Sequence, residues 1–150
     1  MSAGEYCNRE VVIVAKSESI REAVNLMRSH HVGDVVVVDK RDGIPAPIGV
    51  LTDRDIVLEV MAEDVDIDSV NIGDVMSYDL LTVEEDTKLL DALAQMKEKG
   101  VRRIPVVDKQ GTLTGILAID DILELVAEQI NSIVQLITNE NKQERKRRHL

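Results

Sequence analysis

The sequence predicts an α+β fold built from two copies of one β-α-β-β-α unit, which pack sheet to sheet about a pseudo-two-fold axis and precede a C-terminal helical extension. Residues 22–39 align with 91–108 at an offset of 69, sharing an Ala, a Met and a closing Val-Val-Asp. The offset then falls to 66, because the loop at 40–49 is three residues longer than its counterpart at 109–115. A three-stranded sheet with two helices leaves one apolar face uncovered, so two copies would cover each other.

Each copy opens with an apolar run, at 11–14 and at 80–83, that predicts a strand. Ser17 and Asp86 follow these runs and are suitable caps for the next helix. That helix is predicted from apolar residues at helical spacing, and we expect the face that they form to be buried. The residues are Ile20, Ala23, Val24 and Met27 in the first copy, and Leu89, Leu90, Leu93 and Met96 in the second.

Short β-branched runs at 35–38 and 104–107 each precede a glycine-containing turn and a second apolar run, which predicts a hairpin in each copy. A closing helix should begin near Asp55 in the first copy and near Asp121 in the second. Its apolar residues are Ile56, Val57 and Val60 in one copy, and Ile122, Leu123, Leu125 and Val126 in the other.

These elements divide the chain into a first repeat at 8–61, a connecting segment at 62–79 with a short helical turn, and a second repeat at 80–128. Residues 129–150 form a C-terminal helix and basic tail. Helical spacing continues through Ile130, Ile133, Val134 and Ile137, so this helix either lies back on the pair or presents an exposed apolar stripe to a partner helix. We expect it to end near residue 140 and to fray beyond.

Composition and charge exclude several functions. The chain has no Phe or Trp and only two Tyr, so it lacks the aromatic platforms on which single-stranded nucleic acids stack. Five of the 18 basic residues and one of the 28 acidic residues lie in 142–150, which leaves residues 1–141 with a net charge of −14. Such a body repels polyanions. The basic tail is interpreted as a solvated terminus; contact with nucleic acid, an anionic membrane or the acidic body of a neighbour is the alternative.

The remaining sequence features indicate no catalytic or metal site. Cys7 is the only cysteine, so no disulfide can form within the chain, as is typical of a reducing compartment. His30 and His31 are adjacent and cannot chelate an ion as an i, i+4 pair can. No nucleophile motif or phosphate-binding lysine loop is present. No apolar run reaches the length of a membrane span, and the first residues lack a secretory signal pattern. We expect a cytoplasmic, soluble protein that is not an enzyme.

Three stretches carry a family resemblance: GVLTDRDIV at 49–57, GDVMSYDLLTV at 73–83 and VRRIPVVD at 101–108. Together with the repeat, they make residues 10–130 similar to a tandem pair of CBS domains, the regulatory modules named after cystathionine β-synthase. The resemblance implies a stand-alone module that binds an AMP-, ADP- or ATP-like nucleotide between its repeats and has no catalytic cofactor. It also implies a disk-like homodimer that signals to a separate effector protein.

Residues at 52–55 suggest how a nucleotide would be held. Thr52, Asp53 and the first free amides of the closing helix would meet at a helix N-terminus, which attracts phosphate; simple capping of the helix is the alternative. The resemblance implies that Asp55 accepts hydrogen bonds from ribose hydroxyls, that Arg102 and Arg103 meet phosphate, and that the opening strand of the opposite repeat joins the cleft. The expected site is therefore Thr52, Asp53, Asp55, Thr82, Val83, Arg102, Arg103, Ile104 and Pro105.

A second, weaker cleft should contain Ile13, Val14, Asp34, Ala118 and Asp121. Ala118 lacks the hydroxyl of its counterpart Thr52, and the carboxylate of Asp34 would repel phosphate, so this cleft would be empty or hold S-adenosylmethionine or a related adenosyl compound. A competing hypothesis is a constitutive dimeric scaffold that binds no ligand and recruits a partner through its C-terminal helix and tail.

Overall fold

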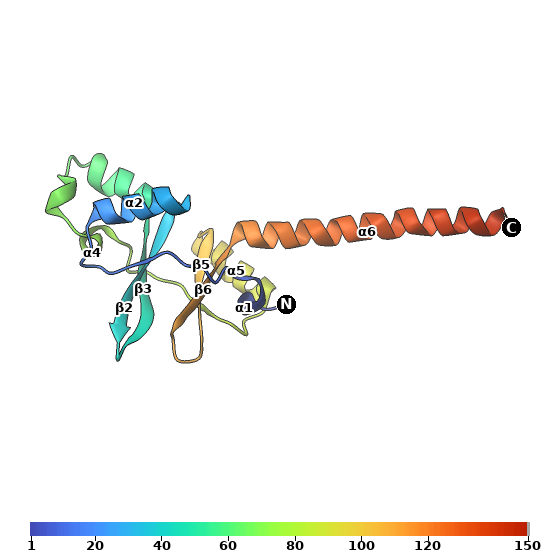
Figure 1. Ribbon diagram of the computed structural model, residues 1–150, viewed down its shortest axis with the longest axis horizontal. Helices are drawn as coiled ribbons and strands as arrows, with labels where there is room; N and C mark the ends of the chain where they lie inside the picture. Colours follow the sequence, from blue (N-terminus) through green and yellow to red (C-terminus); the bar gives the residue numbers. More distant parts are fainter. Residues whose placement is uncertain (150) are drawn as a thin grey trace.

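The computed structural model, which describes residues 1–149, confirms the α+β fold with two similar halves (Figure 1). One sheet consists of β1 (Ile13–Val14), β2 (Asp34–Arg41) and β3 (Ile44–Thr52), and the other of β4 (Val83–Glu84), β5 (Arg103–Val107) and β6 (Leu113–Ala118). In each sheet the short opening strand pairs in parallel with the middle strand, and the hairpin pairs are antiparallel. The opening strands have two residues each, so they are shorter than the four-residue runs that predicted them.

Helices α2 (Ile20–His30) and α5 (Leu89–Lys99) follow the opening strands. The closing helix of the first repeat is α3 (Asp53–Asp55), which continues as the π-helical turn η1 (Ile56–Met61). In this turn the amide of Ala62 donates to the carbonyl of Val57, five residues earlier. The closing helix of the second repeat is the first part of α6 (Ile119–Arg148). Both closing helices begin two residues before the predicted positions.

The helix caps differ from those predicted. The first cap is Ser19, whose hydroxyl accepts from the amide of Glu22 at 3.1 Å, and Ser17 lies outside the helix. In the second repeat Lys88 occupies the cap position and makes no side-chain cap, so Asp86 does not cap α5 either. The amide of Leu89 donates instead to the carbonyl of Met1 at 3.1 Å. A backbone group from the start of the chain therefore replaces the missing side-chain cap.

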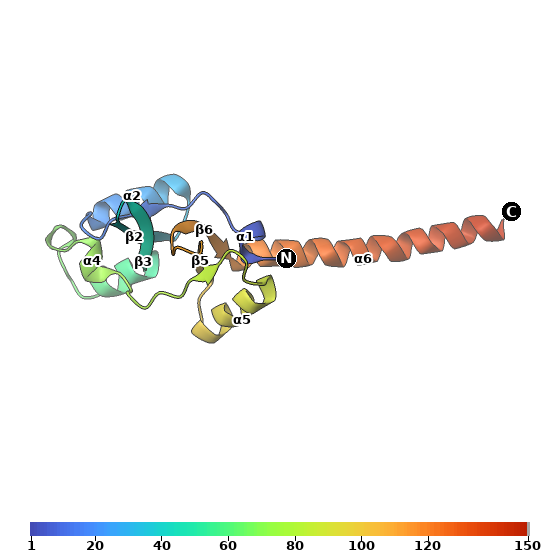
Figure 2. The same cartoon turned by 90° about the horizontal axis from the view of Figure 1, so that it is seen from below.

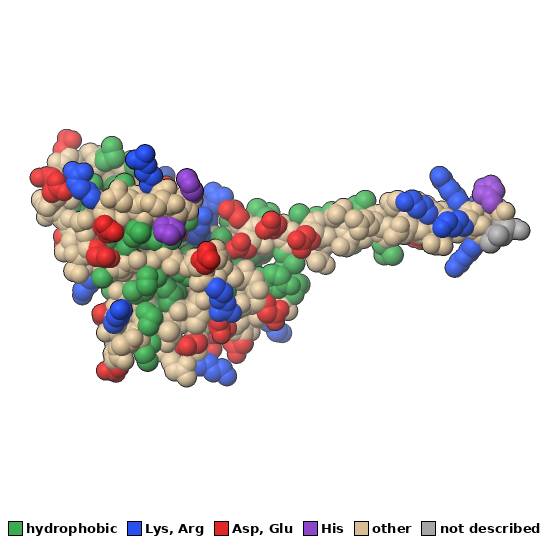
Figure 3. All heavy atoms as spheres, in the orientation of Figure 1, with side chains coloured by type: hydrophobic (Ala, Val, Ile, Leu, Met, Phe, Trp, Pro, Cys, Tyr) green, Lys and Arg blue, Asp and Glu red, His purple; other side chains and the backbone are tan. Residues whose placement is uncertain are grey.

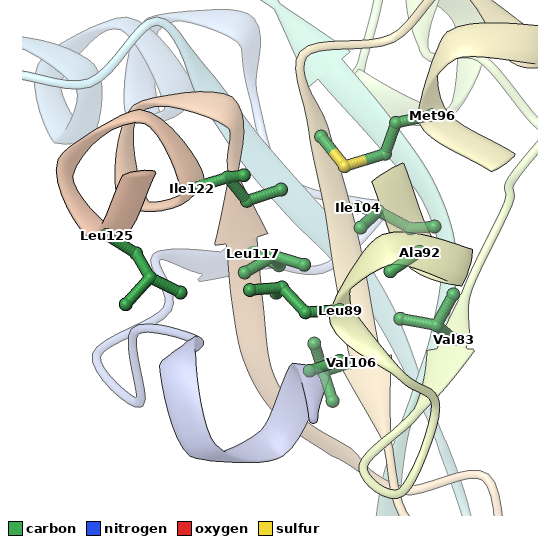
Figure 4. Close-up of a cluster of buried hydrophobic side chains, with 10 residues drawn as sticks. Val83, Leu89, Ala92, Met96, Ile104, Val106, Leu117, Ile122 and Leu125 are labelled. Atoms are coloured by element: carbon green, nitrogen blue, oxygen red, sulfur yellow. The ribbon is translucent and has the colours of Figure 1, made fainter. Parts of the chain in front are cut away.

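Two separate apolar clusters form the core, one between each sheet and its helices. The second, drawn in Figure 4, gathers Val83, Leu89, Ala92, Met96, Ile104, Val106, Leu117, Ile122 and Leu125. The prediction that the apolar faces of α2 and α5 are buried was wrong at Val24 and Leu90, which are exposed. On the closing helices Val57, Leu123 and Val126 are exposed as well.

The segments that precede each repeat cross to the other one. Helix α1 (Ala3–Tyr6) packs with the second repeat, where Ala3 is fully buried in the core cluster. Helix α4 (Ile72–Val75), which follows the 3-10 turn η2 (Ile67–Ser69), packs with the first repeat through Ile72. Residues 2–8 and 71–77 are separated by the same offset of 69 as the repeats. The sequence analysis placed residues 1–7 outside any repeat and missed this exchange.

Gly49 and Gly115 permit this crossing. Asn8 bridges to Ile116, and Ser77 bridges to Val50, so each crossing segment runs against β6 or β3 at the residue that follows one of these glycines. A Cβ atom on Gly49 would lie 2.3 Å from the carbonyl oxygen of Ser77. The glycine that opens GVLTDRD is therefore required by close packing of the backbone.

Helix α6 extends away from the body as a single stalk (Figures 1 and 2). It runs to Arg148, so the prediction of fraying after residue 140 was wrong. The residues beyond 140 are mostly Lys, Arg, Gln and Glu, which favour helix, and the basic last turn complements the helix dipole. Ile130, Ile133, Val134 and Ile137 are all exposed. The helix therefore does not lie back on the pair, and its apolar stripe is exposed; a partner helix for this stripe stays a prediction. Among residues 1–149 no helix is long and apolar enough to cross a membrane.

Candidate functional site

A cleft of about 590 Å³ opens between the two repeats. The first repeat lines it with the end of β3 and the start of α3, and the second repeat with the start of β5, the end of β6 and the segment before β4. Six of the nine residues expected in the preferred site line this cleft: Thr52, Asp53, Asp55, Arg102, Arg103 and Pro105. We call it the main cleft.

Thr52 and Asp55 close the start of α3 with a reciprocal capping box. The amide of Asp55 donates to Thr52 Oγ1 at 3.0 Å, and the amide of Thr52 donates to Asp55 Oδ2 at 2.9 Å. The amide of Asp53 donates to the carbonyl of Gly33 at 2.8 Å, and the amide of Arg54 to Asp53 Oδ1 at 2.8 Å. The first amides of this helix are thus already paired, so the expectation of free amides at this helix start was wrong.

Arg103 and Asp34 occupy equivalent positions in the two repeats and contact each other across the pseudo-two-fold axis. Arg103 Nη1 lies 3.4 Å from Asp34 Oδ2, and the side chain of Asp34 is 12% exposed against 37% for that of Arg103. Burial raises the pKa of the Asp34 carboxyl above its ordinary value, although the Arg103 guanidinium acts to lower it, and the Asp53 carboxylate adds to the rise. The half-buried guanidinium of Arg103 is therefore held beside a carboxylate.

Three expected residues do not line the main cleft. Val83 and Ile104 are buried in the core of the second repeat, and Thr82 lies outside the lining. Leu80 and Leu81 take their place. The opposite repeat does contribute its opening segment, as the resemblance implied, but two residues earlier, because β4 starts only at Val83 and turns its side chain into the core.

The second cleft is smaller, at about 200 Å³, and shows the same shift. Asp34, Ala118 and Asp121 line it as expected. Val14 is buried in the core of the first repeat, and Val11 and Val12 line the cleft in place of Ile13 and Val14. Arg103 and Asp34 line both clefts, so the second cleft also contains a guanidinium that the sequence analysis assigned to the main cleft alone.

Two further basic residues line the main cleft, Arg54 and Lys99. Lys99 pairs with Asp79, another lining residue. Both were missed because neither stands out from its surroundings in sequence: Arg54 separates two aspartates, and Lys99 ends a helix rich in charge. The TDRD stretch is the signal that could have indicated Arg54, since a residue between two site aspartates lies at the same helix start.

Comparison with known proteins decides the family. The family model described as CBS domain matches residues 3–62 and 72–128. The chain belongs to the CBS domain family. The two matches include α1 and α4, the segments that cross between the halves, and the chain as a whole is a CBS domain pair.

Individual CBS proteins are similar over most of this chain. The uncharacterized protein MK0525 of Methanopyrus kandleri is 39% identical over 83% of the chain, which spans 62% of that protein's length. The CBS domain-containing protein YhcV of Bacillus subtilis is 34% identical over 93% of this chain and 97% of its own. Among solved structures, the CBS domain pair of protein MJ0100, in complex with 5′-methylthioadenosine and S-adenosyl-L-methionine, superposes with a TM-score of 0.74. It is 22% identical and covers 86% of this chain and 98% of that one.

Proposed function

We propose that this CBS pair is a regulatory module that binds an adenine nucleotide in the main cleft. The observation that carries the proposal is the composite lining of that cleft, which joins a hydroxyl and a carboxylate from the first repeat to two guanidinium groups from the second. Its volume of about 590 Å³ falls within the usual range of small-molecule sites. A ligand that contacts both repeats would stabilise one arrangement of the pair, which is how a module without catalytic groups can carry a signal.

The chemistry of the lining assigns a part of the nucleotide to each group. Asp55 can accept hydrogen bonds from the two ribose hydroxyls, because a carboxylate that already accepts one amide still has acceptor capacity. The aliphatic side chains of Val50, Leu81 and Ile116 line the cleft and suit the faces of an adenine ring. Arg102 and Arg103 suit phosphate oxygens, for which guanidinium groups provide paired donors.

The number of phosphates that the ligand can carry depends on the balance of basic and acidic side chains that line the main cleft. Arg54, Lys99, Arg102 and Arg103 are offset by five lining aspartates, which are Asp34, Asp53, Asp55, Asp79 and Asp120. A ligand with few or no phosphates, such as AMP or S-adenosylmethionine, is therefore as good a candidate as ADP or ATP. The solved complex of MJ0100 contains 5′-methylthioadenosine and S-adenosyl-L-methionine, but at 22% identity it indicates the fold alone.

The competing function is a ligand-free scaffold that recruits a partner through α6. The exposed apolar side chains along α6 favour it. Nucleotide-dependent melting separates the two functions, because a ligand at 100 times its dissociation constant adds about 2.7 kcal/mol to the free energy of unfolding. We expect at least one of AMP, ADP, ATP and S-adenosylmethionine to raise the melting temperature, and the absence of any shift would favour the scaffold.

Arg102→Ala locates the binding. Arg102 is exposed and forms no ion pair among the described residues, so its loss should leave the unliganded melting temperature nearly unchanged and reduce the shift caused by a phosphorylated ligand. Lys109→Ala, an exposed residue outside the main cleft, is the matched control. If the ligand raised the melting temperature of Arg102→Ala as much as that of Lys109→Ala, Arg102 would not be part of the site.

A further inference from the structure

The stalk formed by α6 carries a regular apolar stripe that begins at the body. Leu123, Val126, Ile130, Ile133 and Ile137 follow one another at alternating steps of three and four residues, the spacing of a two-helix seam. All five are exposed, with Leu123 and Ile133 each at 59%. The regularity of the spacing indicates a helical partner rather than a flat apolar surface.

The charges of α6 are segregated along its length. Asp120, Asp121, Glu124 and Glu128 lie at its start, and Lys142, Arg145, Lys146, Arg147 and Arg148 at its end. Figure 3 shows acidic side chains where the stalk leaves the body and Lys and Arg side chains around its free end. A parallel pair of such helices would place like charges side by side at both ends, whereas an antiparallel pair brings the basic end of each helix to the acidic start of the other.

We propose that α6 pairs antiparallel with α6 of a second copy of this chain. When Ile130 of one copy lies opposite Ile133 of the other, Val126 lies opposite Ile137. The same register places Lys142 opposite Asp121 of the second copy. It also carries the basic tail toward an acidic body, since residues 1–118 hold 13 basic and 22 acidic side chains, a net charge of −9. The paired stretch from 123 to 140 is then about 27 Å long at 1.5 Å per residue, with Leu123 opposite Glu140 of the second copy at each end. This pairing is independent of whether the main cleft binds a nucleotide.

Distance measurement between spin labels tests both the pairing and its direction. The full chain carries Gln143→Cys as the labelling site in a Cys7→Ser background. In the antiparallel register Gln143 lies opposite Asp120 of the second copy, so the two labels are separated by about 35 Å along the helix axes. A parallel pair would hold them roughly 10 Å apart, the distance between packed helix axes.

Two matched variants separate helix pairing from association through other surfaces. Ile133→Glu places a charge within the stripe, and Gln135→Glu places the same charge on the opposite side of α6. Both positions are exposed in the single chain, so neither substitution should disturb the apolar cores of the body. We expect the 35 Å distance in the parent and in Gln135→Glu and its loss in Ile133→Glu. A distance near 10 Å, no coupling between labels, or a distance that Ile133→Glu leaves unchanged would each overturn the proposal.

Discussion

Asp55 has a structural role and a proposed ligand role that can be separated by a single substitution. Its Oδ2 accepts the amide of Thr52 and thereby caps α3, and the proposed site requires the same carboxylate to accept ribose hydroxyls. Removing the whole side chain would disturb both roles, at a cost of about 1 kcal/mol for the cap alone. Asparagine keeps an oxygen for the cap and removes the charge.

We predict that Asp55→Asn weakens nucleotide binding by roughly tenfold or more, because hydrogen bonds to charged groups contribute about 1.5–3 kcal/mol. Asp121→Asn is the matched control, since Asp121 Oδ2 accepts the amide of Ala118 at 3.0 Å in the equivalent cap of the second cleft. Titration calorimetry measures both. If Asp121→Asn lowered the affinity as much as Asp55→Asn, the ligand would not be specific to the main cleft.

Asp34 predicts a pH dependence of stability. Its pKa is raised in the folded state, mainly by burial, so the folded protein retains a proton at pH values where the unfolded chain has lost it. The free energy of unfolding therefore falls as the pH rises from the ordinary carboxyl pKa, near 3.8, to the raised value. Asp34→Asn should remove this decline. Its stability relative to the parent should rise between pH 3 and pH 7 in denaturant titrations, and a difference that is constant or of opposite sign would contradict the buried, costly carboxylate.

The same substitution tests competition for Arg103. In Asp34→Asn the Arg103 guanidinium no longer has a charged partner at 3.4 Å, so it becomes available to a ligand phosphate. We predict that Asp34→Asn binds ADP or ATP more tightly, by up to about tenfold, or 1.4 kcal/mol. Affinity for an uncharged adenosine, measured by the same calorimetry, should not change. A gain for adenosine as large as that for ADP would indicate a general effect on the cleft instead of the proposed competition.

At the scale of elements, sequence reasoning succeeded where one pattern determined one element. The hairpins follow from β-branched runs around a glycine turn, and α2 and α5 from helical spacing, so local residues were sufficient for both. The crossing of α1 and α4 was not predictable in this way, because the two short helices gain their stability from contacts with the opposite repeat, such as that of Ala3 with the second core. The repeat at 2–8 and 71–77 was present but too short to notice.

The candidate site was likewise predicted correctly where its elements were, and incorrectly where the start of a strand was misjudged. Thr52, Asp55 and the two arginines were found because the elements that carry them were predicted correctly. Thr82 and Val83 were expected in place of Leu80 and Leu81, because an apolar run does not show where within it the strand starts. A start at Val83 instead of Leu80 places Val83 in the core and leaves the preceding leucines at the cleft.

The crossing segments predict different costs for two equivalent glycines. In Gly49→Ala the new Cβ would meet the carbonyl oxygen of Ser77 at 2.3 Å, a backbone atom that cannot easily move. In Gly115→Ala the nearest contact is the Sγ of Cys7 at 2.5 Å, the end of a side chain that can rotate. We predict that Gly49→Ala lowers the free energy of unfolding by about 1–3 kcal/mol, as overpacking does, and that Gly115→Ala costs less. Thermal unfolding gives the order, and the reverse order would show that the crossing at Ser77 tolerates displacement.

At the scale of the molecule, the two halves are joined by the crossing segments and by the Arg103–Asp34 pair, and the main cleft lies between them. A ligand in that cleft contacts both repeats at once, so its binding energy bears on their relative arrangement. The stalk begins at Ile119, which lines the main cleft together with Ala118 and Asp120. The cleft and the proposed pairing surface therefore share one helix.

The central claim is that the composite main cleft holds an adenine nucleotide, and a crystal structure of the complex tests it most directly. The protein would be crystallised with whichever of AMP, ADP, ATP and S-adenosylmethionine gives the largest melting shift. The account predicts electron density in the main cleft, with the ribose on Asp55 and the adenine between aliphatic side chains that include Leu81. Density in the second cleft alone, or a nucleotide whose ribose lies away from Asp55, would contradict it.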